Sequence, residues 1–207
     1  MTREKLIEIC LTFSPNYAKT WAQEVISTHS LQTLWKLIME SDTLGLSNDD
    51  LEKFEFRSAY ILETVYCKNS TLFFPYMSQF FRLFPAITNG SMRRHFAKIC
   101  FLAIKEGNRP QNLEAIATTC ADWIIDPKTR VAVKVWALDI LAELAKTEQW
   151  IKELLPEVIA SLSLNPSAGM TVRLRRLQST TKTKKGASKN ELRHYKLASE
   201  SSLSTNV

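Results

Sequence analysis

The sequence has few of the residues on which catalytic and metal sites depend. Five glycines in 207 residues leave no Gly-rich loop that could hold a phosphate, and the Gly-x-Ser-x-Gly and His-Glu-x-x-His motifs are absent. None of the three histidines is followed three or four positions later by a metal-ligand partner. We therefore expect no catalytic residue, no cofactor and no metal.

Cysteines are also few, and none is in a CxxC pair. Cys10, Cys67, Cys100 and Cys120 each lie among apolar residues of a predicted helix. We interpret them as reduced thiols of the core, with metal binding or disulfide formation as the alternative.

Long uncharged apolar runs are missing as well. The longest, around residues 70–81, contains Pro75 and Gln79 and is too short to cross a bilayer. The first ten residues carry charges inside their apolar run, unlike a signal peptide. We expect a soluble cytoplasmic protein without a membrane partner.

Positive charge is concentrated at one end of the chain. The net charge is +6, but nine of the 27 basic residues and two of the 21 acidic ones follow residue 172. The preceding part keeps 18 basic and 19 acidic residues, a net charge of −1. From residue 179 the composition changes to Ser, Thr and Lys, which predicts a flexible basic tail over residues 179–207.

The whole chain is 45% hydrophobic, and few of its runs alternate with period two. This pattern predicts an all-α fold. Turn residues divide it into ten helices that form five hairpins, over residues 2–13, 17–27, 30–40, 47–67, 70–87, 91–106, 111–125, 127–146, 150–164 and 167–178.

The helix predicted over residues 127–146 has apolar residues around most of its circumference. Pro127 suits its first turn, because the missing N–H would have no partner there. A helical wheel places Asp139 and Glu143 on one exposed strip, and Arg130 with Lys134 on a second, opposite one. A helix with neighbours on both flanks is typical of a stack of helices.

A small residue recurs in the second helix of successive hairpins. Ala22, Ala59, Ala97 and Ala137 are 37, 38 and 40 residues apart. An apolar residue follows each of them three positions later, so we expect adjacent hairpins to approach closely at the alanines.

This pattern resembles the HEAT-type helical repeat, whose first helix often contains a proline and whose second begins with a hydrophobic and a basic residue. Pro75 with Met92-Arg93 and Pro156 with Val172-Arg173 match that pattern. The first two hairpins lack the proline, and Arg175 stands where the last small residue should be. The resemblance implies a right-handed α-α superhelix, or solenoid, over residues 1–178.

Basic residues occur about once per hairpin near the start of each second helix, where HEAT arrays form their concave face. This basic ladder comprises Lys19, Arg57, Arg94, Arg130, Lys134 and Arg173. In such arrays these residues either bind neighbouring helix ends and carboxylates or bind a ligand. Both roles stay open at this point.

The sequence thus favours a non-enzymatic scaffold that binds a protein partner, and we expect the bound segment to be acidic. The alternative is nucleic-acid binding through the cations of the ladder, the tail or both. Trp136 and Asp139 also invite comparison with the alkylpurine DNA glycosylases built from HEAT-like repeats. The helical wheel argues against glycosylase activity. It places Asp139 opposite Arg130 and Lys134, so that one groove could not hold all three, and it makes Trp136 a core residue.

Overall fold

The computed structural model describes residues 1–163, 166 and 168–177, and every described element is helical. The chain divides after residue 158 into two units, of which the second is described only at residues 159–163, 166 and 168–177. In sequence order the α-helices are α1 (Arg3–Leu11), α2 (Tyr17–Ser27), α3 (Leu31–Met39), α4 (Asn48–Lys68), α5 (Met77–Leu83), α6 (Gly90–Lys105), α7 (Leu113–Ile125), α8 (Val131–Leu144) and α9 (Gln149–Ser163). Residues 168–177 of the second unit are also helical.

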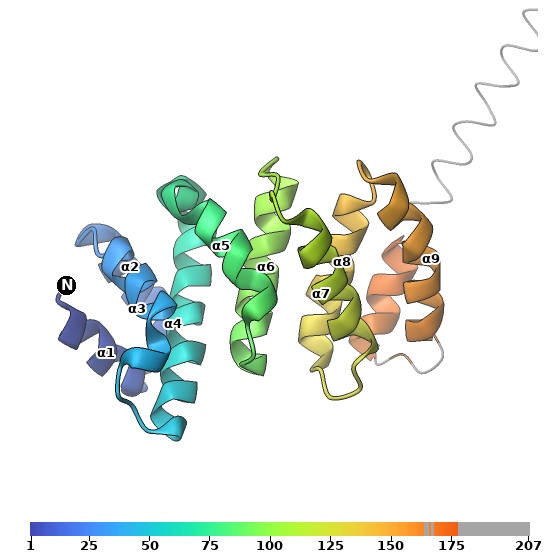
Figure 1. Cartoon of the computed structure of the whole chain (residues 1–207). Coiled ribbons are helices and arrows are strands. Elements are labelled where there is room, and N and C mark those ends of the chain that lie inside the picture. The colour runs from blue at the N-terminus through green and yellow to red at the C-terminus, as the bar shows by residue number, and fades with distance from the viewer. Residues whose placement is uncertain (164–165, 167, 178–207) are drawn as a thin grey trace, which may run out of the picture. The chain divides into compact units, whose positions relative to one another are not determined.

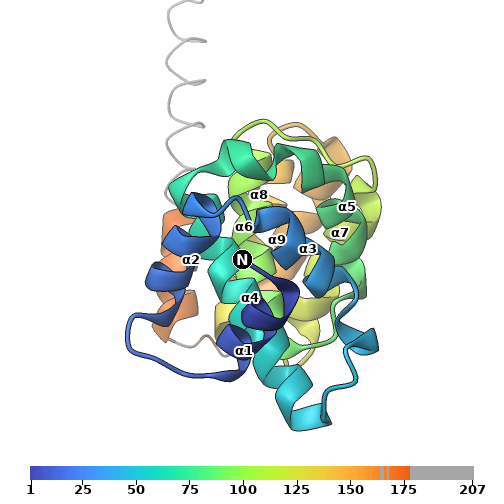
Figure 2. The same ribbon diagram turned by 90° about the vertical axis from the view of Figure 1, so that its left-hand side faces the viewer.

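Within the first unit, α4 packs against α2 and α6, and α8 packs against α6 and α7. Figure 1 shows α4, α6 and α8 side by side in the order of the chain, and in the end-on view of Figure 2 they lie one behind another. Ala59, Ala97 and Ala137 are completely buried, as is Ala22 in α2. The predicted alanines are thus core residues of the helices that pack together.

Local signals explain several helix ends. The Ser47 hydroxyl accepts a hydrogen bond from the Asp50 amide and caps α4, and Asn89 caps α6 by accepting from the amides of Ser91 and Met92. Among the predicted helices, α2 has the predicted bounds, and α1, α3, α4, α6 and α7 differ from theirs by one or two residues at the ends.

Two predicted helices differ more. The segment predicted as one helix over 70–87 is α5 between two 3-10 helices, Ser70–Tyr76 and Phe84–Ala86. Each contains a proline, Pro75 or Pro85, which has no N–H for an α-helical ladder. This segment packs through aromatic rings, with Phe73 and Phe80 completely buried.

The start of α8 was predicted wrongly at Pro127. The helix begins at Val131, because Asp126 holds the preceding residues in a turn. Its carboxylate accepts from the Lys128 amide at 2.9 Å and from the Thr129 hydroxyl at 2.8 Å.

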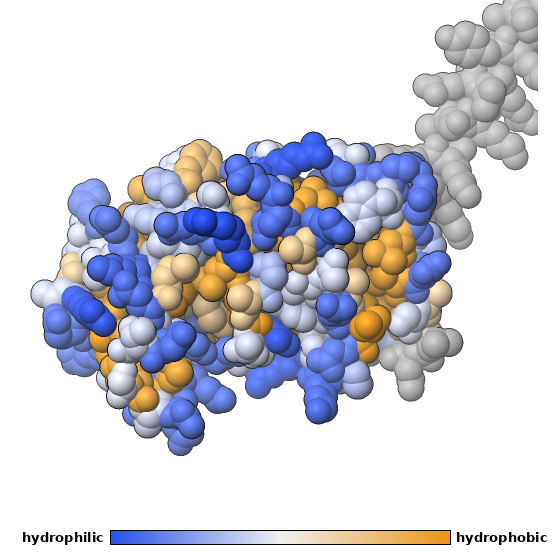
Figure 3. All heavy atoms as spheres, viewed as in Figure 1, coloured by the Kyte–Doolittle hydropathy of each residue, from blue (hydrophilic) through white to orange (hydrophobic). Residues whose placement is uncertain are grey.

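No helix in the described part of the chain is long and apolar enough to cross a membrane. On the face of the first unit seen in Figure 3, hydrophobic residues lie in separate patches between hydrophilic ones. The tail predicted over 179–207 lies outside the described residues.

Candidate functional site

Within the first unit, the members of the basic ladder have different partners and do not line one common recess. Arg57 on α4 turns toward α1, where its Nη1 donates to the Cys10 carbonyl at 3.1 Å. Its guanidinium also lies over the rings of Phe13 and Tyr17, at 5.8 and 6.0 Å from their centroids. Arg57 therefore joins α4 to the first helices of the chain.

Three other ladder residues have different surroundings. Lys19 is exposed on α2. Lys134 is half-buried on α8 and acts on Asp126, whose pKa is lowered first by the Lys128 amide, then by the Thr129 hydroxyl and to a smaller extent by the Lys134 charge. Arg173 is half-buried in the second unit, within the helical residues 168–177.

Arg94 and Arg130, by contrast, meet at one place. Both are exposed, and together with Phe56 they line a recess of about 50 Å³ where the starts of α6 and α8 adjoin α4. Gly90, Ser91, Ala132 and Val133 complete the lining of this Arg94–Arg130 recess. Arg130 Nη1 donates to the Ser91 hydroxyl at 3.0 Å, which links α8 to α6.

Two aromatic side chains on α4 extend this surface. Phe56 and Tyr60 are 37% and 40% exposed, and their rings stack with centroids 6.3 Å apart. On the inner side Tyr60 stacks on the His95 imidazole at 4.9 Å. Phe56, Tyr60, Arg94 and Arg130 therefore form an aromatic–cationic surface over α4, α6 and α8.

A charged cluster beneath the rings fixes His95. The Glu63 carboxylate on α4 is 2.6 Å from His95 Nδ1 and 2.6 Å from Lys98 Nζ, both on α6. Burial acts to raise the pKa of Glu63, but the bonds to His95 and Lys98 outweigh it, so the pKa is lowered. Burial likewise opposes the charge of Lys98, and the bond to Glu63 outweighs it, so the pKa of Lys98 is raised. The cluster is a structural support for the stacked rings.

The sequence interpretation missed Phe56, Tyr60, Glu63 and His95. The signal was present, because Ala59 and Leu62 mark the buried side of α4. Phe56 and Tyr60 lie three positions before and one after Ala59, outside that side. Aromatic residues outside a predicted buried face could therefore have indicated an exposed aromatic surface.

The predicted solvent exposure of Asp139 also has to be corrected. Its predicted place on an exposed strip is wrong, since Asp139 is 6% exposed while Lys146 of the same predicted strip is exposed. The wheel assigned the charged arc to solvent, but α8 packs against α6 and α7 and little of its circumference remains free. Trp136, predicted in the core, is half-buried beside Phe101, with ring centroids 5.6 Å apart.

The cysteine prediction holds for Cys10, Cys100 and Cys120, which are buried free thiols, and is wrong for Cys67, which is exposed. Burial raises the pKa of Cys67, so its thiol is a weak nucleophile at neutral pH. No group of three His, Cys, Asp or Glu side chains within the described ranges could hold a metal ion.

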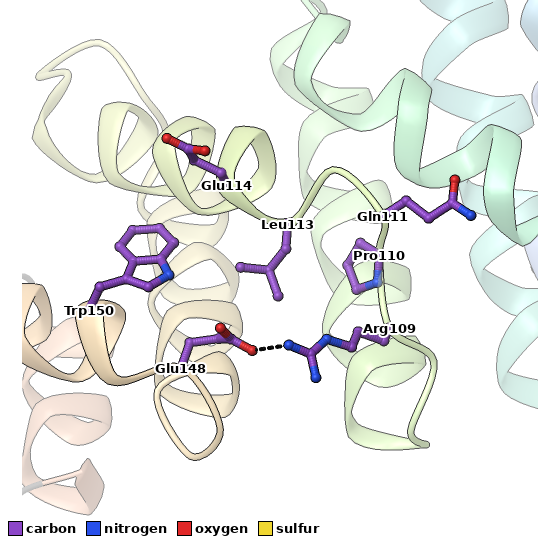
Figure 4. Close-up of a pocket in the computed structure, with 7 residues that line it drawn as sticks. All are labelled: Arg109, Pro110, Gln111, Leu113, Glu114, Glu148 and Trp150. Carbon is purple, nitrogen blue, oxygen red and sulfur yellow. Dashed lines mark hydrogen bonds and ion pairs between the residues drawn. The ribbon is translucent and has the colours of Figure 1, made fainter.

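A larger hollow of about 500 Å³ lies between the segment before α7 and the start of α9. Figure 4 shows Leu113 between Trp150 and Pro110, with the Arg109–Glu148 ion pair beside them. Glu114 and Gln111 point away from that pair. Arg109 is paired with Glu148, and the other charged residue of the lining, Glu114, points away from that pair, so no two free charges converge in this hollow.

The geometry therefore places exposed cations and exposed aromatic rings together at the aromatic–cationic surface, and the HEAT likeness stays a prediction from the sequence. Protein-family models, curated proteins and solved structures were compared with this chain, and none of them matches it.

Proposed function

We propose that the chain is a cytoplasmic, non-enzymatic binding scaffold whose aromatic–cationic surface binds an acidic segment of a protein partner. The observation that carries this proposal is the position of Arg94 and Arg130. Both guanidinium groups are exposed beside two exposed rings, and neither makes an ion pair with a described residue. Arginine and aromatic side chains are the residues that contribute most to protein interfaces.

The architecture that we propose for this scaffold is a HEAT-type, right-handed solenoid. Its support is the packing of α4, α6 and α8 in chain order, with buried alanines that recur every 37 to 40 residues. A stack of helical hairpins of this kind presents one extended surface built from equivalent helices.

Nucleic-acid binding is the second candidate, because bases stack on aromatic rings while cations contact phosphates. The wider surroundings favour a protein. Along the same face Lys98 is bound to Glu63, and Arg57 is directed to the Cys10 carbonyl. A nucleic-acid strand needs a row of free cations along its backbone.

Site-specific photo-crosslinking tests the proposal. A photoreactive phenylalanine at Phe56 should capture an acidic segment from an extract of the protein's own cells, identified by sequencing the crosslinked peptide. The same reagent at Phe74, an exposed phenylalanine of the 3-10 helix before α5, is the matched control.

Charge-reversal variants provide the second part of the crosslinking test. Arg94→Glu with Arg130→Glu should abolish the capture at Phe56, whereas Arg82→Glu, an exposed arginine on α5, should leave it unchanged. Capture of the same peptides at Phe56 and Phe74 would contradict the proposal. Capture of nucleic acid at Phe56 would establish the second candidate instead.

A further inference from the structure

The Arg94–Arg130 recess has an unusual charge for its size. Seven residues line it, and they include two arginines and no carboxylate. Its volume of about 50 Å³ is roughly that of two water molecules in the liquid. The recess thus combines two positive charges with room for one small group.

Uncharged donors face the same place. Ser91 Oγ accepts a hydrogen bond from Arg130, so its own O–H proton remains available to donate. At the start of α8 Arg130 provides no side-chain cap, and the first-turn residues Ala132 and Val133 line the recess. The positive end of the α8 dipole therefore adds to the charge of the two guanidinium groups.

The geometry points to a phosphorylated side chain of the partner as the group that enters this recess. The inference rests on the proposed function and names the chemistry of the partner segment. A phosphate monoester carries a charge near −2 at neutral pH and three acceptor oxygens, which matches two guanidinium groups and a hydroxyl. A single carboxylate would leave one guanidinium uncompensated.

The surroundings favour one phosphate on a protein over the repeated phosphates of a nucleic acid. The next cation after Arg94 on α6 is Lys98, which is bound to Glu63. Further along the same helices Glu106 accepts from the Tyr66 hydroxyl at 2.8 Å and places a carboxylate at the edge of the α4–α6 face. Phe56 and Tyr60, next to the recess, offer an apolar surface to the residues that flank the phosphorylated one.

A pair of labelled peptides tests this inference on the full chain. The probe is fluorescein-Asp-Phe-Glu-Ser-Glu-Phe-Asp with serine or with phosphoserine at its centre, followed by fluorescence anisotropy. We expect the phosphorylated form to bind about tenfold more tightly. Arg94→Gln and Arg130→Gln should each bring the ratio of the two affinities close to one, and Arg82→Gln should leave the ratio unchanged.

Inorganic phosphate titrated into the wild-type chain provides a test that needs no variant. It should shift the NMR signals of the Ser91 and Ala132 amides, while sodium chloride at equal ionic strength should not. Equal binding of both peptides, with loss of both in Arg130→Gln, would overturn the phosphate inference and leave the acidic scaffold standing. Binding of neither peptide, or stronger binding of a single-stranded oligonucleotide, would overturn both.

Discussion

The Glu63 carboxylate and the His95 imidazole lie 2.6 Å apart between α4 and α6, directly beneath the ring of Tyr60. Both side chains are more than nine-tenths buried, and Glu63 is the hydrogen-bond partner of His95 Nδ1 as well as of Lys98 Nζ. Glu63→Ala should lower the free energy of unfolding by about 3 kcal/mol, because it leaves His95 and Lys98 without their acceptor. Urea denaturation measures the change. Glu52→Ala, at an exposed position of α4, should stay within about 0.5 kcal/mol.

The same carboxylate makes stability depend on pH in acid. The pKa of Glu63 is lowered in the folded protein, so the unfolded chain binds more protons as the pH falls. The contribution of Glu63 is complete above the ordinary pKa of a glutamate and is lost as the pH drops through the lowered one. The difference in unfolding free energy between wild type and Glu63→Gln should therefore shrink from pH 7 to roughly pH 3. A difference that grows in acid would contradict this assignment.

The buried alanines set how closely α4, α6 and α8 can approach. Ala97→Leu or Ala137→Leu adds three carbon atoms where no space exists and should cost about 1–3 kcal/mol. Ala115→Leu, the same change at an exposed position of α7, should cost less than about 0.5 kcal/mol. Thermal unfolding of the three variants compares them directly, and equal losses would refute the packing role of the alanines.

The thiols should differ in their access to reagents. Cys67 is exposed, whereas burial raises the pKa of Cys10 to about 11 and raises that of Cys100 and Cys120 further. A disulfide reagent such as DTNB should modify one thiol of the native protein and four after unfolding. Cys67→Ser should remove the native reaction, and Cys10→Ser should not. Because the pKa of Cys67 is itself raised, its reaction should become faster at alkaline pH.

Regular patterns in the sequence predicted much of the fold. The bounds of α2, the cap at Ser47 and the recurring alanines follow from spacing and turn chemistry within short windows. The burial of Asp139 does not follow from such windows, because it depends on what surrounds α8 in three dimensions. Periodicity finds the apolar face of a helix and cannot tell whether a charged face also has neighbours.

The site was predicted only in part for a similar reason. Arg94 and Arg130 were among the predicted residues, but Arg57 occupies an equivalent position in the repeat and is set apart by its contact with the Cys10 carbonyl. The distance between Arg94 and Arg130 arises from the packing of α6 against α8, which residue spacing does not encode. Their meeting with Phe56 required the structure.

In the 3-10 helices around α5, the backbone hydrogen bonds and the side-chain packing should differ in how well they are ordered, although the two usually go together. Backbone hydrogen bonds there are of poorer geometry, and Pro75 and Pro85 contribute no amide, so amide protons of residues 70–87 should exchange with solvent sooner than those of α6. The side chains are held more firmly, since Trp35 packs edge-on against Phe73 and its indole N–H donates to Gln79 at 2.8 Å. The NMR signals of the carbon-bound indole protons of Trp35 should therefore remain sharp and well dispersed in conditions where the backbone amides of residues 70–87 have already exchanged with deuterium.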